Sequence, residues 1–287
     1  MPELPEVETI RRQLAPSVEG RTIERLEILD PRWCAPAATE DVAQAVTGRR
    51  VEGLSRRGKY LVWELEGERF AVMHLRMTGT LLLARAGETA ERPHLRVRID
   101  LDSGERVLFC DPRRFGTGVV LLDRAAFEAH LAPRVGVEPL GPDFTAAALR
   151  AMVEGRRAPV KAFLLSQERI AGVGNIYADE ALFTAGIHPL RPVGTLKPKQ
   201  LLALRDAVVG TLEAGIAAKG ATIDDFRHAD GARGAFQDAF QVHRRAGEPC
   251  PRCGTPVKKL RAAGRGTYVC ERCQPRPRGR RRVAAAK

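Results

Sequence analysis

The chain has 287 residues, 44% of them hydrophobic, and a formal net charge of +12. This length suits two domains better than one. Apolar runs such as Leu81–Leu83 and Val119–Leu122 are far shorter than the ~18 residues that a membrane span needs, and no charged start with an apolar centre opens the chain. We therefore expect a soluble cytoplasmic protein with no membrane partner.

The chain opens with a proline followed closely by three carboxylates. If Met1 is removed, Pro2 becomes a free secondary amine that titrates near pH ~8 and is partly nucleophilic at neutral pH. Its attack on a sugar aldehyde carbon gives an iminium, and Glu3 could then move protons on the same sugar. The alternative is structural: Pro5 lies in the first turn of a helix whose positive end the carboxylates complement.

Apolar residues then follow two different periods. Val7, Ile10 and Leu14 recur at helical spacing, which predicts an amphipathic helix that ends by Gly20. From residue 22 to 122 short β-like runs alternate with turn residues. In the run 95–101, apolar and charged residues alternate, which indicates one buried and one wet face. We expect an antiparallel sandwich or barrel, whose clearest runs are 59–65, 70–75, 95–101 and 106–109.

A connector rich in proline and glycine, residues 133–142, precedes a helical part. Thr145 is predicted to cap one helix and Pro198 to open a longer one. Between them lies the segment 171–177, in which Gly172 and Gly174 permit tight turns with positive φ, and Asn175 can cap the next helix. Its amides would suit a phosphate, although an ordinary helix–turn–helix connection is the alternative.

Four of the six cysteines form two C-x2-C pairs separated by 16 residues: Cys250, Cys253, Cys270 and Cys273. This spacing is typical of a tetrahedral zinc site with short turns that aim two thiolates each at one ion. Four thiolates leave no open position, so we expect one structural Zn(II). Disulfides are the weaker alternative in a chain without a secretion signal.

The positive charge is concentrated at one end. Residues 250–287 carry a net charge of +11, whereas the other 249 residues sum to +1. A cationic end on a balanced body predicts a polyanion partner, DNA or RNA. For residues 275–287 alone, a solvated basic tail is the favoured interpretation.

Several turns combine charge with apolar tips. In the turn 111–116, Arg113 and Phe115 pair a guanidinium with an aromatic wedge, which could fill a gap in a base stack. Met77 offers another apolar tip and His74 a possible phosphate donor, whereas core packing is the alternative for the methionine. Solvated hairpins remain the alternative for the basic turns.

Six motifs follow one another along the chain: PELPEVE at 2–8, RRGKY at 56–60, HLRMTG at 74–79, DPRRFG at 111–116, GVGNIYADEALF at 172–183 and AGRGT at 263–267. With these motifs the chain resembles the formamidopyrimidine-DNA glycosylase (Fpg/Nei) superfamily over nearly its whole length up to Cys273. The resemblance implies an α+β protein with an N-terminal antiparallel β-sandwich and helix, a helix-two-turns-helix module and a β-hairpin zinc finger, with duplex DNA bound between the halves.

The resemblance also implies residue roles. The catalytic set comprises Pro2 as nucleophile, Glu3 as acid/base, Lys59 near phosphate and lesion, and Arg265 in the last elimination. The DNA-contacting set comprises His74, His94, Arg113, Arg156 and Asn175, and the residues that fill the void of the flipped nucleotide are Met77, Arg113 and Phe115. Glu6 and Thr222 would line the lesion pocket.

The expected protein is thus a monomeric bifunctional glycosylase and lyase for oxidised purines in duplex DNA, associated with the nucleoid. Two alternatives stay open: an endonuclease VIII-like enzyme for oxidised pyrimidines, and a non-catalytic protein that binds damaged DNA. The chain departs from the family pattern at Gly155–Arg157, which lacks lysine, at His243, where tyrosine is common, and in its long basic tail.

The composition and the resemblance together imply the following domains. They are a catalytic β-sandwich (1–132), a linker (133–141), a helical domain (142–240), a four-cysteine zinc finger (241–274) and a basic disordered tail (275–287).

Overall fold

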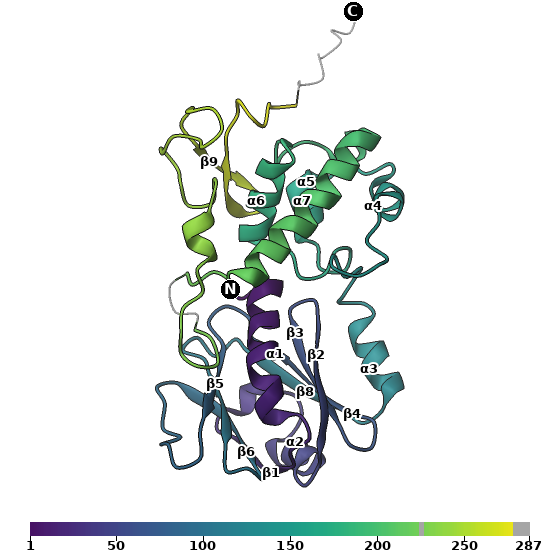
Figure 1. Cartoon of the computed structure of the whole chain (residues 1–287). Helices are drawn as coiled ribbons and strands as arrows, with labels where there is room; N and C mark the ends of the chain where they lie inside the picture. Colours follow the sequence, from purple (N-terminus) through teal and green to yellow (C-terminus); the bar gives the residue numbers. More distant parts are fainter. Residues whose placement is uncertain (224–226, 278–287) are drawn as a thin grey trace, which may run out of the picture. The chain divides into compact units, whose positions relative to one another are not determined.

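The computed structural model describes residues 1–223 and 227–277 (Figure 1). Residues 224–226, part of the segment 221–226 that the family resemblance assigns to capping the lesion, and most of the basic tail lie outside the described part. The chain divides into two compact units. Unit 1 comprises Met1–Gly141, Gln167–Val173 and Leu212–Ala239, and unit 2 comprises Pro142–Ser166, Gly174–Thr211 and Phe240–Lys287. The predicted domains are continuous segments of the chain, whereas each of these units combines several segments. The predicted domain borders therefore stay a prediction.

Unit 1 contains two four-stranded antiparallel sheets. Their strand orders are β1-β6-β7-β5 and β2-β3-β4-β8. The strands are β1 (Ile23–Ile28), β2 (Val51–Arg57), β3 (Tyr60–Leu65), β4 (Arg69–His74), β5 (Thr80–Ala84), β6 (Leu95–Leu101), β7 (Arg106–Cys110) and β8 (Thr117–Leu121). The remaining elements of unit 1 are α1 (Leu4–Val18), η1 (Pro31–Trp33), α2 (Thr39–Val46), α3 (Arg124–Leu131) and η3 (Phe236–Ala239).

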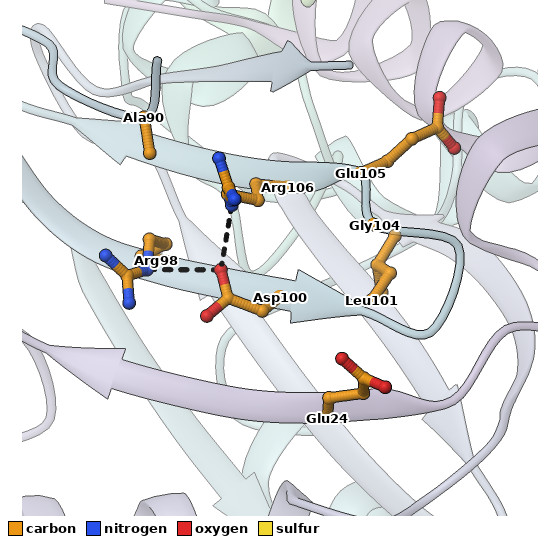
Figure 2. A pocket seen from close by; sticks show the side chains of 8 residues that line it. All are labelled: Glu24, Ala90, Arg98, Asp100, Leu101, Gly104, Glu105 and Arg106. Carbon is orange, nitrogen blue, oxygen red and sulfur yellow. Dashed lines mark ion pairs between the residues drawn. The ribbon is translucent and has the colours of Figure 1, made fainter. Parts of the chain in front are cut away.

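The alternation seen in the sequence separates the two faces of the first sheet. Val97, Ile99 and Leu101 of β6 are buried in one apolar core to which both sheets and α1 contribute, and this confirms the expected sandwich. On the wet face, Asp100 pairs with Arg98 at 3.1 Å and with Arg106 on β7 at 3.6 Å (Figure 2). Together with Glu24 and Glu105 they line a surface pocket of about 350 Å³, whose charged lining consists of three carboxylates and two guanidinium groups.

The helix α1 begins and ends close to where the apolar period predicts. Val7, Ile10 and Leu14 are fully buried in the core of unit 1. Pro5 stands in the first turn, as the structural alternative for the opening segment proposed. A helix that buries this stripe is held firmly in place, and so is the residue that precedes it.

Unit 2 contains mostly helices and one hairpin. The elements are α4 (Ala146–Val153), α5 (Val160–Leu165), α6 (Asn175–Thr184), η2 (Val193–Thr195), α7 (Pro198–Ala217, in unit 2 up to Thr211), β9 (Lys258–Ala262) and β10 (Arg265–Val269). The Thr145 hydroxyl accepts a hydrogen bond from Ala148 N–H at 3.0 Å, and α7 opens at Pro198, so both helix starts are confirmed.

The hairpin β9–β10 turns through two residues with positive φ. Ala263 has φ 52° and Gly264 has φ 72°, the combination that a two-residue turn with the right-handed strand twist requires. Ala262 pairs with Arg265 across this turn, which places Arg265 at the tip of the hairpin. Among the described helices, none combines the length and apolarity needed to cross a bilayer.

Candidate active site and metal centre

The N-terminal residues are held by a capping box. Glu3 is the N-cap of α1: its side chain accepts from the backbone N–H of Glu6, while Glu6 Oε2 accepts from the N–H of Glu3 at 2.7 Å. Pro2, which directly precedes this cap, is itself buried. The capping box therefore fixes the backbone next to the proposed nucleophile and buries the carboxyl of Glu3, which is 2% exposed.

The glycine turn expected to bind phosphate also holds this N-terminus. The N–H of Leu4 donates to Gly172 C=O at 3.1 Å, and Gly172 has φ 79°. An added Cβ at Gly172 would lie 2.6 Å from the Leu4 side chain, so only glycine permits this approach. Gly174 differs from the prediction: its φ of −127° is extended, and it serves as the N-cap of α6.

The turn that carries Lys59 is hydrogen-bonded to a glutamate that is distant in the sequence. Gly58, with φ 57°, donates its N–H to Glu138, which also accepts from Arg56 at 2.9 Å. Arg56 contacts Glu8 as well, at 3.3 Å. Lys59 is 5% exposed. Sequence reasoning missed Glu138 because 80 residues separate it from Gly58 and no local pattern marks it.

His74 lies at the end of β4, beside the Lys59 turn. Its Nδ1 accepts from Arg76 N–H at 2.9 Å, and its ring meets Tyr60 edge-on at 4.7 Å between centroids. Burial, aided by the positive charges of Arg76 and Lys59, lowers the pKa of His74 to about 3. His74 is therefore a neutral imidazole at physiological pH.

One carboxylate organises the three residues expected to fill the DNA void. Asp111 is fully buried and accepts from the N–H groups of Phe115 and Gly116, each at 2.8 Å, and from that of Arg113 at 3.2 Å. It also accepts from the hydroxyl of Thr78, the residue after Met77. The two turns that carry the apolar tips therefore share one anchor.

The tips themselves reach solvent. Phe115 is 50% exposed and Met77 is 37% exposed, unlike Met73, which packs in the core. The guanidinium of Arg113 stands 4.8 Å from the centre of the Phe115 ring, a cation–π contact between two of the residues expected to fill the DNA void. His94, also exposed and with φ 62°, adjoins this turn because its C=O accepts from Asp111 N–H at 2.9 Å.

The two residues expected in the lesion pocket both have protein partners. Glu6 is 1% exposed, and its Oε1 accepts from Ala221 N–H at 2.7 Å. The Thr222 hydroxyl accepts from Gly234 N–H at 2.8 Å, and Thr222 N–H donates to Gln237 Oε1 at 2.8 Å.

In unit 2, Asn175 differs from its predicted role as a helix cap. It is the first residue of α6, makes no cap, and donates its Nδ2 to Gly266 C=O at 3.1 Å. This hydrogen bond ties the start of α6 to the hairpin that presents Arg265, which is exposed. Arg156 is also exposed, and its Nε donates to Met152 C=O at the end of α4.

A buried ionic cluster connects α5, α6 and the hairpin. Lys161 donates to Asp179 at 2.6 Å and to the Thr267 hydroxyl at 2.7 Å, and all three residues are fully buried or nearly so. The other Asp179 oxygen lies 2.9 Å from Nδ1 of His243. His243 therefore belongs to the internal framework of unit 2, and neither the Lys161 nor the Asp179 contact was predicted.

The four paired cysteines meet at one point. Their sulfur atoms lie within 4.8 Å of one another, with Cys253 and Cys270 at 3.4 Å and Cys250 and Cys273 at 3.8 Å. Tetrahedral Zn–S bonds of ~2.3 Å require sulfur separations of about 3.8 Å, so the four residues fit one Zn(II). Hydrogen bonds from the side chain and backbone of Thr255 lower the pKa of Cys253 to about 6, whereas burial and the neighbouring thiols raise the pKa of Cys273 to about 12. Binding of the ion would therefore have to displace the proton of Cys273.

Comparison with known proteins gives matches for the N-terminal, helical and C-terminal parts of the chain. Family models match residues 1–118 (formamidopyrimidine-DNA glycosylase N-terminal domain), 135–227 (formamidopyrimidine-DNA glycosylase H2TH domain) and 247–276 (zinc finger found in FPG and IleRS). A formamidopyrimidine-DNA glycosylase of Chloroflexus aurantiacus is 47% identical over 275 residues, which cover 96% of this chain and 98% of the relative.

Two similar solved structures are complexes of the Lactococcus lactis FPG protein with DNA. One, of a mutant with DNA containing Fapy-dG, is 33% identical with a TM-score of 0.89, and the other, of the wild type with DNA containing an oxidised pyrimidine, is 34% identical with a TM-score of 0.87. Each match covers 96% of this chain and 100% of the other.

The β-sandwich with its capped N-terminus, the helical module and the four-cysteine hairpin define a zinc-finger DNA glycosylase. More narrowly, the chain belongs to the formamidopyrimidine-DNA glycosylase family.

Proposed function

We propose that this protein removes oxidised purines, first 8-oxoguanine and formamidopyrimidines, from duplex DNA and then cleaves the strand. The observation that carries the proposal is the capping box at the start of α1, which buries Glu3 directly after Pro2. Nucleophilic attack at a sugar carbon needs a nucleophile and an acid/base group held in fixed positions, and two adjacent residues of a capped helix provide both. Complexes of the L. lactis relative with Fapy-dG DNA support the substrate class.

In the first reaction the lone pair of the Pro2 nitrogen attacks C1′ of the damaged nucleotide. The glycosidic bond breaks, and the base leaves with the bonding electrons and accepts a proton. Opening of the sugar ring at O4′ and loss of the proton on the Pro2 nitrogen give the iminium, and Glu3 transfers these protons. Removal of Met1 is required, because only then is the Pro2 nitrogen a secondary amine.

Strand cleavage follows from the same intermediate. The iminium acidifies the C2′ hydrogen, so the C3′–O bond breaks by β-elimination and the 3′ side leaves as a phosphate. A second, δ-elimination breaks the C5′–O bond, and hydrolysis of the remaining imine releases the sugar fragment. Lys59 neutralises phosphate charge during these steps, and Arg265 assists the last of them.

The other residues hold the DNA. His74, His94, Arg156 and Asn175 contact the backbone, and Met77, Arg113 and Phe115 occupy the space of the flipped nucleotide, which offsets the few kcal/mol of lost stacking. Glu6 and Thr222 shape the lesion site. Bound Zn(II) keeps the hairpin of Arg265 folded. The protein works as a monomer in the cytoplasm, at the nucleoid.

Borohydride trapping tests the chemistry. The chain without Met1, incubated with an 8-oxoguanine duplex and borohydride, should form a covalent adduct, whereas Pro2→Gly and an N-terminally extended chain should bind DNA with little adduct. No adduct from the native chain would refute the enzyme and favour a non-catalytic damage binder.

A second arm compares substrates. Because the L. lactis relative was crystallised with an oxidised pyrimidine as well, excision of 8-oxoguanine and of thymine glycol is measured side by side. Faster excision of 8-oxoguanine is expected, and a strong preference for thymine glycol would assign the chain to the endonuclease VIII-like alternative.

A further inference from the structure

The Glu6 carboxylate joins two parts of unit 1 that are far apart in the sequence. Its Oε2 accepts from the N–H of Glu3 and its Oε1 accepts from the N–H of Ala221, both at 2.7 Å. Glu6 is 1% exposed, so these charge-assisted hydrogen bonds are shielded from water. The Glu6 carboxylate thus forms a bridge from the N-cap of α1 to Ala221, which lies 215 positions after Glu6.

The far end of this bridge is held closely. Gly220 has φ 76°, and an added Cβ there would lie 2.8 Å from Glu6 Oε1. The C=O of Gly220 accepts from Phe236 N–H at 3.0 Å, and Thr222 is bonded through both its N–H and its hydroxyl. Residues 220–222 therefore cannot move without disturbing the Glu6 carboxylate.

The near end contains the proposed acid/base residue. Glu6 fixes Glu3 twice, because it accepts from the Glu3 backbone and donates its own N–H to the Glu3 side chain. A shift of the Glu6 side chain therefore changes the position of Glu3.

We propose that Glu6 is a positioning residue that couples the segment Gly220–Thr222 to Glu3, so that the conformation of this segment sets the rate of base removal. The proposal rests on the proposed function, in which Thr222 faces the lesion and Glu3 transfers protons during excision. Cleavage at a preformed abasic site needs no proton for a leaving base, so it uses Glu3 for fewer proton transfers and depends less on this coupling.

A matched pair of glycine substitutions tests the coupling. Gly220→Ala and Gly48→Ala carry the same backbone strain, with φ 76° and 79°, but the added Cβ of Gly48→Ala meets nothing within 4 Å. Gly220→Ala should slow single-turnover excision of the lesion about tenfold to a hundredfold relative to Gly48→Ala, as displaced reacting groups do. Cleavage of a preformed abasic duplex should stay close to that of Gly48→Ala.

A readout independent of activity is the hydrogen exchange of the Glu3 amide. Gly220→Ala acts at the far end of the bridge, yet it should speed exchange at Glu3, and Glu6→Gln should speed exchange at whichever of the Glu3 and Ala221 amides loses its acceptor. The amide of glutamine can accept only one of the two bonds while keeping the same volume. In the double variant the loss in excision should not exceed that of the worse single variant, since both remove one interaction.

Three results would overturn the coupling: equal excision by Gly220→Ala and Gly48→Ala, unchanged exchange at Glu3 in Gly220→Ala, or an equal loss of lesion excision and abasic cleavage. Failure of the native chain to form a borohydride adduct would refute the proposed function instead. The hydrogen exchange of the Glu3 amide would still test whether the Glu6 bridge exists, because it needs no activity.

Discussion

The ammonium group of Lys161 lies 2.6 Å from Oδ1 of Asp179, and both side chains have no exposed surface. A buried charge whose partner is removed is strongly destabilising, because nothing compensates its lost hydration. We expect Lys161→Met to lower the free energy of unfolding of unit 2 by about 3 to 5 kcal/mol. Urea denaturation followed by far-UV circular dichroism measures it.

The control is Lys258→Met on β9, which removes a solvent-exposed ion pair with Glu271. Exposed pairs contribute ~0 to 1 kcal/mol, so this variant should unfold almost as the native protein does. Equal unfolding free energies for the two variants would show that the Lys161 pair does not stabilise unit 2.

Asp111→Asn should loosen the apolar tips. The carboxylate accepts from three backbone N–H groups and the Thr78 hydroxyl, and an amide nitrogen in its place opposes some of these donors. We expect a loss of about 1 to 3 kcal/mol in unfolding free energy. The affinity for a duplex with an abasic site, measured by fluorescence anisotropy, should fall as Arg113 and Phe115 lose their positions.

Asp102→Asn serves as the control, because Asp102 is exposed and accepts from the N–H of Thr22. If both variants bind the abasic duplex equally well, Asp111 does not position the wedge.

His74 should make the protein less stable in acid. The pKa of His74 is about 3 in the folded protein and ~6.5 in the unfolded chain. Below pH ~6.5 the imidazole is therefore protonated in the unfolded chain but stays neutral in the folded protein. Stability is therefore complete above pH ~6.5 and falls with decreasing pH, by roughly 1 kcal/mol per pH unit from this group. His74→Asn, which keeps an acceptor for Arg76 N–H, should flatten this dependence.

The measurement is urea denaturation between pH 7 and pH 5, with His130→Asn as control. Burial lowers the pKa of His130 as well, but His130 is only partly buried and its substitution should change the slope less. An unchanged slope in His74→Asn would contradict the prediction.

Zinc removal should unfold the hairpin and spare unit 1. Both tryptophans of the chain, Trp33 and Trp63, are buried in unit 1, so their emission reports on that unit. Cys253→Ser should lose the metal and weaken DNA binding while the tryptophan emission stays native.

Elemental analysis measures the zinc content, fluorescence anisotropy the DNA affinity and tryptophan fluorescence the folding of unit 1. The control is Cys34→Ala, which lies outside the cluster and should retain one zinc ion per chain. Full DNA affinity in a metal-free sample would contradict the prediction.

Local patterns in the sequence predicted a large part of this protein. The helical period of Val7, Ile10 and Leu14 placed α1, the alternation in 95–101 placed the buried face of β6, and the cysteine spacing predicted the metal centre. Each depends on a period or spacing of a few residues, which the geometry of a helix, strand or metal ion dictates directly. Ordered motifs along the chain indicated the family.

The sequence alone did not reveal which distant groups meet. Asn175 looked like a helix cap, but its amide donates to Gly266, 91 residues away, and Gly174 takes the cap position. Glu138 under the Lys59 turn, Asp179 beside Lys161 and Ala221 on Glu6 are likewise long-range partners. A buried carboxylate must find donors, yet only the folded chain decides which ones reach it, because side-chain type is a local property and proximity is a global one.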